Sequence, residues 1–480
     1  MSAPILMWHR RDLRLTDNPA MDWAAAQGRP VIPVFLHDEV VETWGAAPRW
    51  RLGLSLAAHA RRLEEVGSGL ALRRGDALEA LRALIRETGA DTIVWNRLYV
   101  ADERARDTAV KEALRGDGLT AKSFCGHVLF EPWTVKTGQG GYYRVYSPFW
   151  RAVRDRDPGT PFAPVEALQA PADWPASDAL GAWDLGRAMR RGAAVVEPHA
   201  VAGELAARER MVAFMENRVG AYAEARDMLA EEGTSGLSEN LTYGEISVRA
   251  CWAAGRMKLD EGAAGAETFL KELVWRDFAH HLAYHTPQIV AENWRPEWDR
   301  FPWRDDSADA ETWRRGRTGV AVVDAAMRQM WVTGTMHNRA RMLVASYLTK
   351  HLMTHWRLGC DHFADCLIDW DPASNAMGWQ WTAGSGPDAS PFFRIFNPDT
   401  QAEKFDPKGR YRRRWVAELA GARPQDRASN APDGAVAYFD AIPLSWGMSP
   451  EDPYPAEPIV GLKEGRERAL EAYAAREAAE

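Results

Sequence analysis

The first 125 residues alternate between strand-like and helix-like patterns, and this alternation restricts the fold more than any other feature of the chain. Short apolar runs predict five strands, at residues 5–9, 30–37, 70–75, 92–97 and 120–125. The stretches between them place apolar residues three and four positions apart, as amphipathic helices do. This alternation predicts an α/β domain with a parallel five-stranded sheet covered on both faces. No G-x-G-x-x-G motif follows a strand, so the domain is Rossmann-like without the dinucleotide-binding signature.

A chain of 480 residues exceeds one hydrophobic core, and its patterns divide it into three parts. We expect the α/β domain at residues 1–130, a Pro-, Gly- and Ala-rich interdomain linker at 131–200, and an all-helical domain at 201–480. A capping box from Thr242 to Glu245 predicts one helix start. Other helices are predicted near 266–285, 318–333, 336–357 and 361–368. The charged tail, residues 461–480, is interpreted as a solvated surface helix.

Charge and composition exclude several classes of protein. The net charge of −8 argues against non-specific coating of a polyanion, although a local basic groove is compatible with it. The chain has no apolar run of membrane-spanning length and no secretory pattern, so we expect a cytoplasmic protein without membrane contact. Its four cysteines do not form a disulfide scaffold. The spacing of Cys360, His362 and Cys366 fits no common zinc motif, and we expect no metal.

Two segments carry candidate ligand-binding groups. The small-residue turn in "EGTSGLSENL" can form an anion-binding concavity from successive backbone N–H groups, although an ordinary helix-capping loop is the alternative. In "LKELVWRDFAHHL", Glu272, Trp275 and Arg276 share one helical face, which suits a polar aromatic ligand. The alternative there is a surface Glu–Arg pair.

A third segment, "MHNRARMLVASYL", is apolar enough to predict a buried helix. Asn338, Arg341 and Met342 share one face, while Arg339 points elsewhere. A buried arginine requires a partner, and we predict that Arg341 pairs with Asp369.

The stretch "GWQW" places two tryptophans two residues apart. On a helix, Trp379 and Trp381 therefore point to roughly opposite faces and cannot form one aromatic box. Trp356 and Trp303 precede them at wide intervals, so a line of indoles is one interpretation. Filling of a large helical core is the alternative for most of the 22 tryptophans.

Taken together, these segments resemble the photolyase/cryptochrome flavoprotein family. The resemblance rests on motifs that run in the family's order over nearly the whole chain: "WHRRDLRLTDNPA", "DERARD", "EGTSGLSENL", "ELVWRDF", "GRTGVAVVDAAMRQMWVTGTMHNRARM", "LIDWDPASNAMGWQWTAGSGPDASPFFRIFNP" and "QAEKFDPKGRYRRRW". It implies an antenna-binding α/β domain and a helical domain that holds FAD. Within the family the chain looks like a class I cyclobutane pyrimidine dimer photolyase, a carbon–carbon lyase. Such an enzyme repairs DNA by electron transfer from photoexcited FADH⁻ to a flipped-out dimer.

The resemblance also implies roles for individual residues. The family's flavin-binding positions are matched by Tyr222, Thr234, Ser235, Gly236, Leu237, Ser238, Arg341, Asp369, Asp371 and Asn375, with Asn375 beside flavin N5. The dimer pocket is matched by Glu272, Trp275, Asn338, Arg339, Met342 and Trp381. Positions facing DNA phosphates are matched by Arg226, Arg276, Arg394 and Gln401. The electron-hopping triad is matched by Trp379, Trp356 and Trp303.

Physical chemistry supports these implied roles. Trp275, Trp381 and Met342 supply apolar and stacking walls for a pyrimidine dimer flipped out of the duplex. Asn338 can donate a hydrogen bond to the carbonyls that gain negative charge. Glu272 can do so only when protonated, which burial would favour.

Some features distinguish members of the family. Asn338 and Met342 occupy places where (6-4) photolyases carry a histidine pair, and Asn375 stands where plant-type cryptochromes carry aspartate. A light-sensing cryptochrome without repair activity is the alternative function, and a light-independent flavin oxidoreductase is a third. Trp370 replaces a small residue and is expected to pack near the flavin. For the antenna we expect methenyltetrahydrofolate with Glu103 as a contact, with a deazaflavin or second flavin as alternatives, in a monomeric protein.

Overall fold

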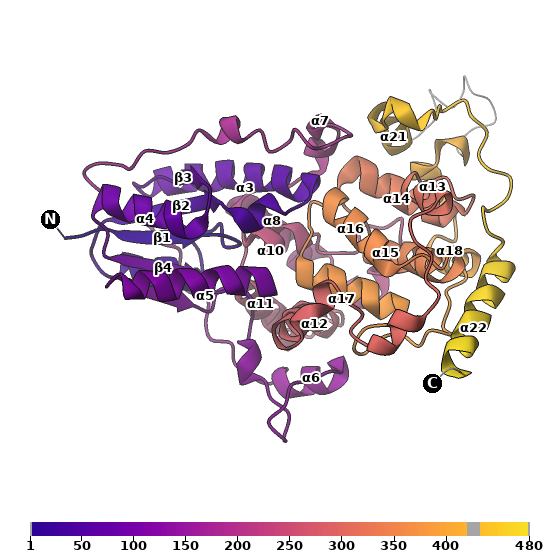
Figure 1. Cartoon of the computed structure of the whole chain (residues 1–480), viewed down its shortest axis with the longest axis horizontal. Coiled ribbons are helices and arrows are strands. Elements are labelled where there is room, and N and C mark those ends of the chain that lie inside the picture. Colours follow the sequence, from indigo (N-terminus) through magenta and orange to yellow (C-terminus); the bar gives the residue numbers. More distant parts are fainter. Residues whose placement is uncertain (1, 420–432, 479–480) are drawn as a thin grey trace.

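The computed structural model describes residues 2–419 and 433–478, and it divides into an α/β domain and a larger helical domain (Figure 1). The sheet has the order β3-β2-β1-β4-β5, and every pairing is parallel. Its strands are β1 (Ile5–His9), β2 (Val31–His37), β3 (Ala71–Arg74), β4 (Thr92–Asn96) and β5 (Thr120–Phe124). The predicted fold class is therefore confirmed.

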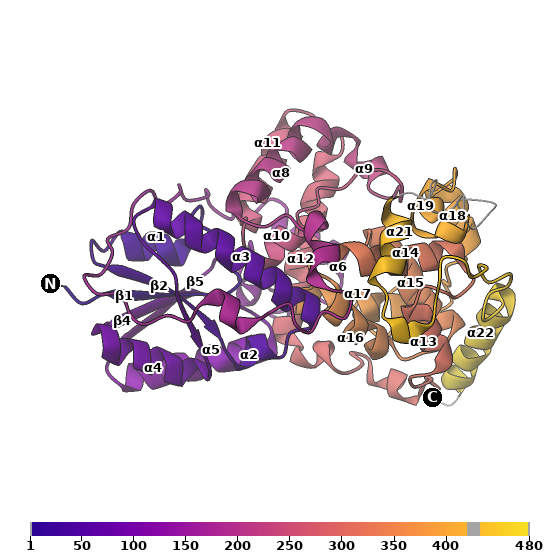
Figure 2. The same ribbon diagram turned by 90° about the horizontal axis from the view of Figure 1, so that it is seen from above.

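Helices cover both faces of this sheet, which explains why its strands lack a polar side. In Figure 2, α1 (Pro19–Ala25) and α3 (Ala46–Glu65) lie on one face, and α4 (Ala77–Thr88) and α5 (Ala101–Gly116) lie on the other. Alternate side chains of β1 enter separate cores: Leu6 and Trp8 pack in one, while Ile5 and Met7 pack in the other. Burial of both alternating sets makes the strand an apolar run.

Of the remaining helices, α2 belongs to the α/β domain, and the others lie within the linker or follow it. The α-helices are α2 (Glu39–Glu42), α6 (Tyr146–Val153), α7 (Ala193–Val196), α8 (Glu204–Asn217), α9 (Tyr222–Ala225), α10 (Ser238–Tyr243), α11 (Val248–Asp260), α12 (Ala266–His285), α13 (Ala308–Arg314), α14 (Ala321–Thr333), α15 (Asn338–Ser346), α16 (Trp356–Cys366), α17 (Pro372–Ala383), α18 (Pro398–Phe405), α19 (Arg410–Trp415), α21 (Asp433–Ala441) and α22 (Leu462–Ala478). Among the described helices none is both long and apolar enough to cross a membrane.

Two helix predictions need correction. The segment predicted as one helix at 336–357 is divided: α15 ends at Ser346, a π-helical turn η7 (Tyr347–His351) follows, and the chain turns at Met353, whose φ is +54°. The predicted capping box at Thr242 is also wrong. Ser247 caps α11 instead, because its hydroxyl accepts the N–H of Ala250, while Thr242 lies within α10.

The two domains contact each other through buried arginine and glutamate side chains. Arg51 on α3 pairs with Glu245, and both side chains are shielded from solvent. Arg14 donates to the carbonyl of Gly244 at 2.9 Å. The carboxylate of Glu204, at the start of α8, accepts the backbone N–H groups of Leu15 and Thr16. These contacts, called the domain contact below, join the end of β1 to the first helices of the helical domain.

Candidate functional site

A polar network joins three distant segments of the helical domain. Arg341 on α15 donates to both carboxylate oxygens of Asp369, at 3.0 and 2.7 Å, which confirms the predicted pair. Ser238 at the start of α10 donates to the same carboxylate at 2.7 Å. The predicted flavin-binding turn before α10 and the predicted flavin-binding arginine therefore converge on Asp369. Gly236 in this turn has a φ of +67°, a conformation that glycine adopts without strain.

Tyr222, at the start of α9, lies outside this network. Its ring is buried edge-on against Phe214 and Phe269. In the turn, Leu237 is buried, and the carbonyl of Gly236 accepts a hydrogen bond from Arg210. No role of Thr234, Ser235 or Tyr222 toward a cofactor follows from these contacts, so their roles stay predictions.

Helix α17 presents its two tryptophans to different surroundings, as the helical spacing predicts. Trp379 is 2% exposed and packs edge-on against Phe363. Its indole N–H is buried without a hydrogen-bond partner. Trp381 is only partly buried. A buried, unpartnered donor is uncommon in a folded protein, and it fits a site that an additional polar group completes.

The side-chain amide of Asn375 on α17 is oriented by a hydrogen bond to α16. Its Nδ2 donates to the carbonyl of Cys360 at 3.0 Å. The Oδ1 atom is thereby turned away from α16, the helix that carries Cys360. One turn earlier, Asp371 caps α17 by accepting the N–H of Ser374 at 2.8 Å.

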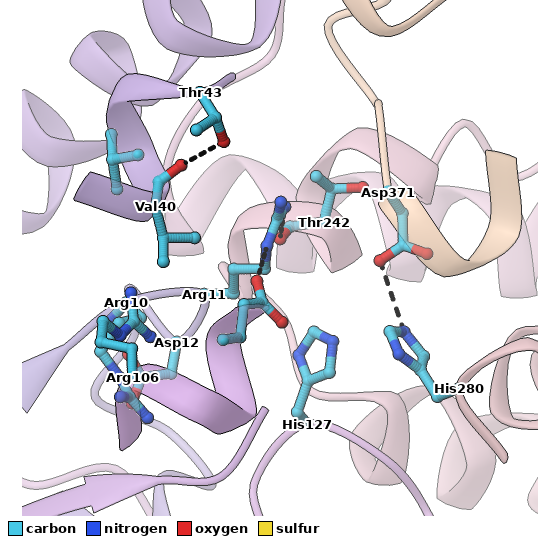
Figure 3. Close-up of polar contacts among 12 residues, drawn as sticks. Arg10, Arg11, Asp12, Val40, Thr43, Arg106, His127, Thr242, His280 and Asp371 are labelled. Atoms are coloured by element: carbon cyan, nitrogen blue, oxygen red, sulfur yellow. Dashed lines mark hydrogen bonds and ion pairs between the residues drawn. The ribbon is translucent and has the colours of Figure 1, made fainter. Parts of the chain in front are cut away.

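A cluster of buried titratable groups lies beside Asp371 and was missed by sequence reasoning. Figure 3 shows His280 of α12 directed at Asp371, with a distance of 3.4 Å between His280 Nε2 and the carboxylate. His127 packs edge-on against His280, with the ring centroids 4.7 Å apart. Burial alone would raise the pKa of Asp371, but His280, Arg276 and Arg11 outweigh it and hold that pKa well below its usual value.

His127, His280 and Asp371 bring three potential ligand atoms within 4.8 Å of one another. The guanidinium of Arg276, however, lies 2.9 Å from His127 Nε2 and donates to the His127 carbonyl at 2.7 Å. A cation would have to enter beside this fixed positive charge. We therefore interpret the cluster as a hydrogen-bonded charge cluster. Arg276 is turned inward, which corrects the prediction that it faces DNA phosphates.

The predicted dimer-pocket residues come from α12 and α15. Glu272 is paired with Arg226, and Arg339 is paired with Asp227 at 2.7 Å. Asn338 is exposed at the start of α15, and Met342 lies one turn later and is partly buried. The Glu272 side chain is 31% exposed, so the burial on which its predicted protonation depends is not found in this structure.

Trp275 has an aromatic partner that sequence reasoning missed. Tyr146 of α6 stacks on it with ring centroids 3.6 Å apart and planes within 6°. The Tyr146 hydroxyl donates to the carbonyl of Lys271 at 2.6 Å, which fixes the ring over α12. Tyr146 lies in the region interpreted as linker, so no helical spacing pointed to it.

The predicted tryptophan line is only partly continuous. His355 lies between Trp303 and Trp356, with ring centroids 5.4 and 5.6 Å away. Trp356 is fully buried and donates to Asn293 at 2.8 Å. Trp379 is on the next helix, and its ring lies against Gly359 of α16, where an added Cβ would clash with it. The order of electron hopping through these residues stays a prediction.

The predicted DNA-facing residues beyond α15 lie on a loop and a short helix. Arg394 is exposed, and its carbonyl accepts a hydrogen bond from the buried Lys350 at 3.2 Å. Gln401 on α18 is partly buried, with its side-chain oxygen unpartnered. Arg226, also in this predicted set, is part of the Glu272 pair.

The predicted antenna contact is not at a surface. Glu103 is 5% exposed, and its carboxylate accepts a hydrogen bond from Arg11 at 3.2 Å. The Arg11 guanidinium lies 4.0 Å from the centre of the Trp44 ring and 5.7 Å from that of Trp370. Trp370 therefore contacts the α/β domain, a role that its place between two predicted flavin residues did not suggest.

The carboxyl edge of the sheet, where open α/β sheets commonly bind ligands, is filled by ion pairs. Arg106 pairs with Asp38 at 2.8 Å, and Arg10 pairs with Asp107 at 2.9 Å. Asn96 donates to Asp12 at 2.6 Å. Figure 3 shows Arg10, Asp12 and Arg106 gathered at this edge.

Two family models match this chain. A DNA photolyase model covers residues 5–171, and a model for the FAD binding domain of DNA photolyase covers residues 269–475. A deoxyribodipyrimidine photo-lyase of Agrobacterium fabrum is 46% identical over 99% of this chain and 98% of its own length. The chain belongs to the photolyase/cryptochrome family.

Other members of the photolyase/cryptochrome family sharpen this placement. A solved structure described as a bacterial class III photolyase from Agrobacterium tumefaciens has a TM-score of 0.90 and 45% identity, and the match covers 100% of this chain and 98% of that one. Cryptochrome-2 of Arabidopsis thaliana is 32% identical over 97% of this chain and 78% of its own length. The predicted class I subgroup gains no support from the class III likeness and stays a prediction.

The residues of the helical domain fit the FAD that this family's domain binds. The Arg341–Asp369–Ser238 network, the Asn375 amide and the buried indole N–H of Trp379 are polar groups on α10, α15 and α17. The segments that carry them pack against one another, as the α15–α17 and α16–α17 contacts show. A flavin has the hydrogen-bonding edges that such scattered, partly unpartnered groups require.

Proposed function

We propose that this protein is a deoxyribodipyrimidine photolyase, which repairs cyclobutane pyrimidine dimers in DNA under light. The proposal is carried by helix α17. This helix presents Asn375 and the buried Trp379 toward the interior of the helical domain, and the partly exposed Trp381 toward its outside. One helix thus serves a cofactor and a substrate at once. The full-length likeness to deoxyribodipyrimidine photo-lyases supports it independently.

FAD, bound and reduced, would supply the electron that opens the dimer's cyclobutane ring under light. The chain's own part is to hold and orient it. Arg341 and Ser238, both fixed on Asp369, form one polar wall. Asn375, held through Nδ2 by Cys360, offers Oδ1 as a hydrogen-bond acceptor. Tyr222, Thr234, Ser235, Gly236 and Leu237 remain the proposed phosphate and ribityl contacts.

The proposed lesion pocket is lined by apolar and aromatic groups that suit a flipped-out dimer. Trp275, Trp381 and Met342 form its walls, and Tyr146 holds the Trp275 ring in one orientation. Asn338 is free to donate a hydrogen bond to a thymine carbonyl, since it is exposed at the first position of α15. Glu272 acts as a donor only if binding of the dimer separates it from Arg226 and favours its protonation.

Three further assignments rest on the same proposal. Trp379, Trp356 and Trp303 would conduct electrons toward the oxidised cofactor, with His355 beside Trp303 and Trp356. The DNA-facing side chains are Arg226, Arg339, Arg394 and Gln401. The protein acts as a cytoplasmic monomer.

An antenna chromophore is part of the proposal, with methenyltetrahydrofolate as first choice and a deazaflavin or second flavin as alternatives. The proposed contact Glu103 gains no support from its surroundings, because its buried carboxylate accepts a hydrogen bond from Arg11. At the carboxyl edge of the sheet, Arg106 and Arg10 are already paired with Asp38 and Asp107. Release and absorption spectroscopy of the bound chromophores would identify the antenna.

The test uses the FAD-loaded protein and ultraviolet-irradiated oligo(dT). Under near-ultraviolet or blue light the thymine absorbance should return, and in the dark it should not. Return of absorbance in the dark would support a light-independent oxidoreductase, while no return in either condition would overturn the proposal.

A light-sensing cryptochrome is the second candidate, favoured by the likeness to Cryptochrome-2. It predicts a light-induced change in the bound flavin's absorption without repair. A protein that photoreduces its flavin but leaves irradiated oligo(dT) unchanged would decide for it.

A further inference from the structure

The C-terminal helix α22 has a buried stripe that its composition does not reveal. Its composition is mostly charged, which predicts a solvated helix, and Glu464, Glu467 and Glu471 are exposed. The less exposed positions follow helical spacing along one side: Gly465, Arg468, Ala469, Ala472, Tyr473 and Arg476. Figure 1 shows this helix at the end of the molecule farthest from the α/β domain. The stripe therefore faces other parts of the helical domain.

The centre of this stripe contacts the loop that carries Arg394. Tyr473 stacks on Phe392 with ring centroids 5.1 Å apart and planes within 11°. Phe392 is 2% exposed, although its neighbours Phe393 and Arg394 are exposed. One aromatic side chain thus anchors the loop, and α22 forms one side of its socket.

The π-helical turn η7 forms another part of this socket, beside Trp298 and Phe301. Lys350 donates to the Arg394 carbonyl at 3.2 Å and lies 5.2 Å from the centre of the Phe392 ring. Arg468 of α22 in turn donates to the carbonyl of His351 at 2.6 Å. An added Cβ at Gly465 would come within 3.1 Å of His351, so the helix and the turn are in close contact.

The same stripe contacts Trp298, a neighbour of Trp303 in the proposed electron path. Arg476 lies 4.3 Å from the centre of the Trp298 ring, and Trp298 packs against Trp303 with centroids 6.0 Å apart. The indole N–H of Trp303 donates to the Trp298 carbonyl at 3.1 Å. Helix α22 is therefore packed behind both the Arg394 loop and Trp303.

We propose that α22 is a positioning element for lesion-bearing DNA, acting through the stack of Tyr473 on Phe392. The inference rests on the proposed function, because Arg394 faces DNA only in a photolyase. An anchored loop presents Phe393 and Arg394 in one arrangement before DNA arrives, so less conformational freedom is lost on binding. Loss of the Tyr473–Phe392 stack should leave the repair of bound DNA unchanged and weaken the binding of DNA.

The experiment compares Tyr473→Ala with Tyr473→Phe in the full-length, FAD-loaded protein. Affinity for a single-stranded oligonucleotide with one thymine dimer is measured in the dark, and repair per absorbed photon is measured at saturating DNA. Tyr473→Ala should raise Kd about three- to tenfold, the usual range for losing one aromatic pair. Its repair yield at saturation should equal that of wild type. Tyr473→Phe keeps the ring and should bind as wild type does.

Two further variants separate positioning from simple loss of folded protein. Glu471→Ala, on the exposed side of the same helix, should change neither quantity. Phe392→Ala combined with Tyr473→Ala should bind no more weakly than Phe392→Ala alone, because both changes remove the same contact. If Tyr473→Ala does not fold, Tyr473→Leu keeps apolar bulk without the flat ring and replaces it.

The outcomes distinguish this inference from the proposed function. Wild-type protein that shows no preference for the dimer would overturn the proposed function itself. Wild-type protein that prefers the dimer, together with Tyr473→Ala of unchanged Kd, would overturn only the role of α22. A Tyr473→Ala variant with lower repair at saturating DNA would also contradict it, because a positioning role predicts a change in Kd alone.

Discussion

The ion pairs at the carboxyl edge of the sheet are buried, whereas those around the proposed lesion pocket are partly open to solvent. Arg106 and Asp38 at the sheet edge are 4% and 1% exposed, and Arg226 and Glu272 near the pocket are 18% and 31% exposed. Both regions contain pairs of arginine with carboxylate. Separating a buried pair leaves a charge without solvent, but a half-exposed pair opens at little cost. The degree of burial, and not the number of charges, marks which region is able to accept a ligand.

The largest effect is expected from breaking a pair at the sheet edge. Arg106→Met leaves Asp38 buried beside no guanidinium and should lower the free energy of unfolding by about 3–5 kcal/mol. Urea denaturation measures this change. Repair per folded molecule should stay the same, and the double variant Arg106→Met/Asp38→Asn should recover part of the loss. A loss below about 1 kcal/mol would place this pair in the same class as the exposed ones.

Substitutions on the two sides of α17 are expected to remove two different functions. Trp381→Ala should weaken dimer binding by about 1–3 kcal/mol, the usual contribution of an aromatic ring stacked on a base. Trp379→Phe should leave dimer affinity and repair by pre-reduced protein unchanged, but should block light-driven reduction of oxidised protein. Binding titrations and flavin absorption under illumination measure the two effects. The same phenotype from both variants would contradict the two-sided role of the helix.

A smaller effect is expected from opening a pocket pair. Arg226→Ala should change the free energy of unfolding by less than about 1 kcal/mol, because the pair is partly solvated. It should nevertheless weaken DNA binding and reduce the slope of log affinity against log salt concentration by about one. Arg276→Ala is the matched control, since its inward guanidinium should not alter the salt slope. An equal change of slope in both variants would restore Arg276 to the DNA-facing set.

The smallest effect concerns pH. Burial, followed by the charge of Arg394, lowers the pKa of Lys350 to about 7 from its ordinary value of 10.5. Between these values the unfolded chain binds a proton at Lys350 that the folded chain does not, so this residue makes stability rise with pH. The contribution of Lys350 should therefore raise the free energy of unfolding of the wild type between pH 7 and about pH 9. Lys350→Met should remove that part of the slope, and an identical slope in both proteins would place the titration elsewhere.

The fold was largely predictable because its signals are local. Apolar runs of five residues with turns between them place strands, and the two-residue spacing of Trp379 and Trp381 decides their directions whatever surrounds them. The pair of Arg341 with Asp369 was also predictable, because an arginine on an apolar helix requires a carboxylate and the next acidic segment contains Asp369.

What could not be predicted depends on contacts between distant segments. Arg276 shares a helix face with Glu272, but its direction is set by His127, which lies 149 residues earlier. Tyr146 stacks on Trp275 from a region without periodicity. Helix α22 has a charged composition, and only its partners η7 and Phe392 reveal that one side is buried.

The domain contact has a consequence for protein engineering. Each half has a core of its own in addition to the clusters that they share, which invites exchange of the α/β half, where an antenna is proposed, between relatives to change the colour that drives repair. Arg51, on the first half, pairs with Glu245 and lies 3.7 Å from Glu239, and both carboxylates are buried and belong to the second half. A chimera joined in the linker would therefore leave a buried charge without its partner. The natural unit for grafting is the chain from the α/β domain to beyond Glu245, so that Arg51 and Arg14 keep their partners.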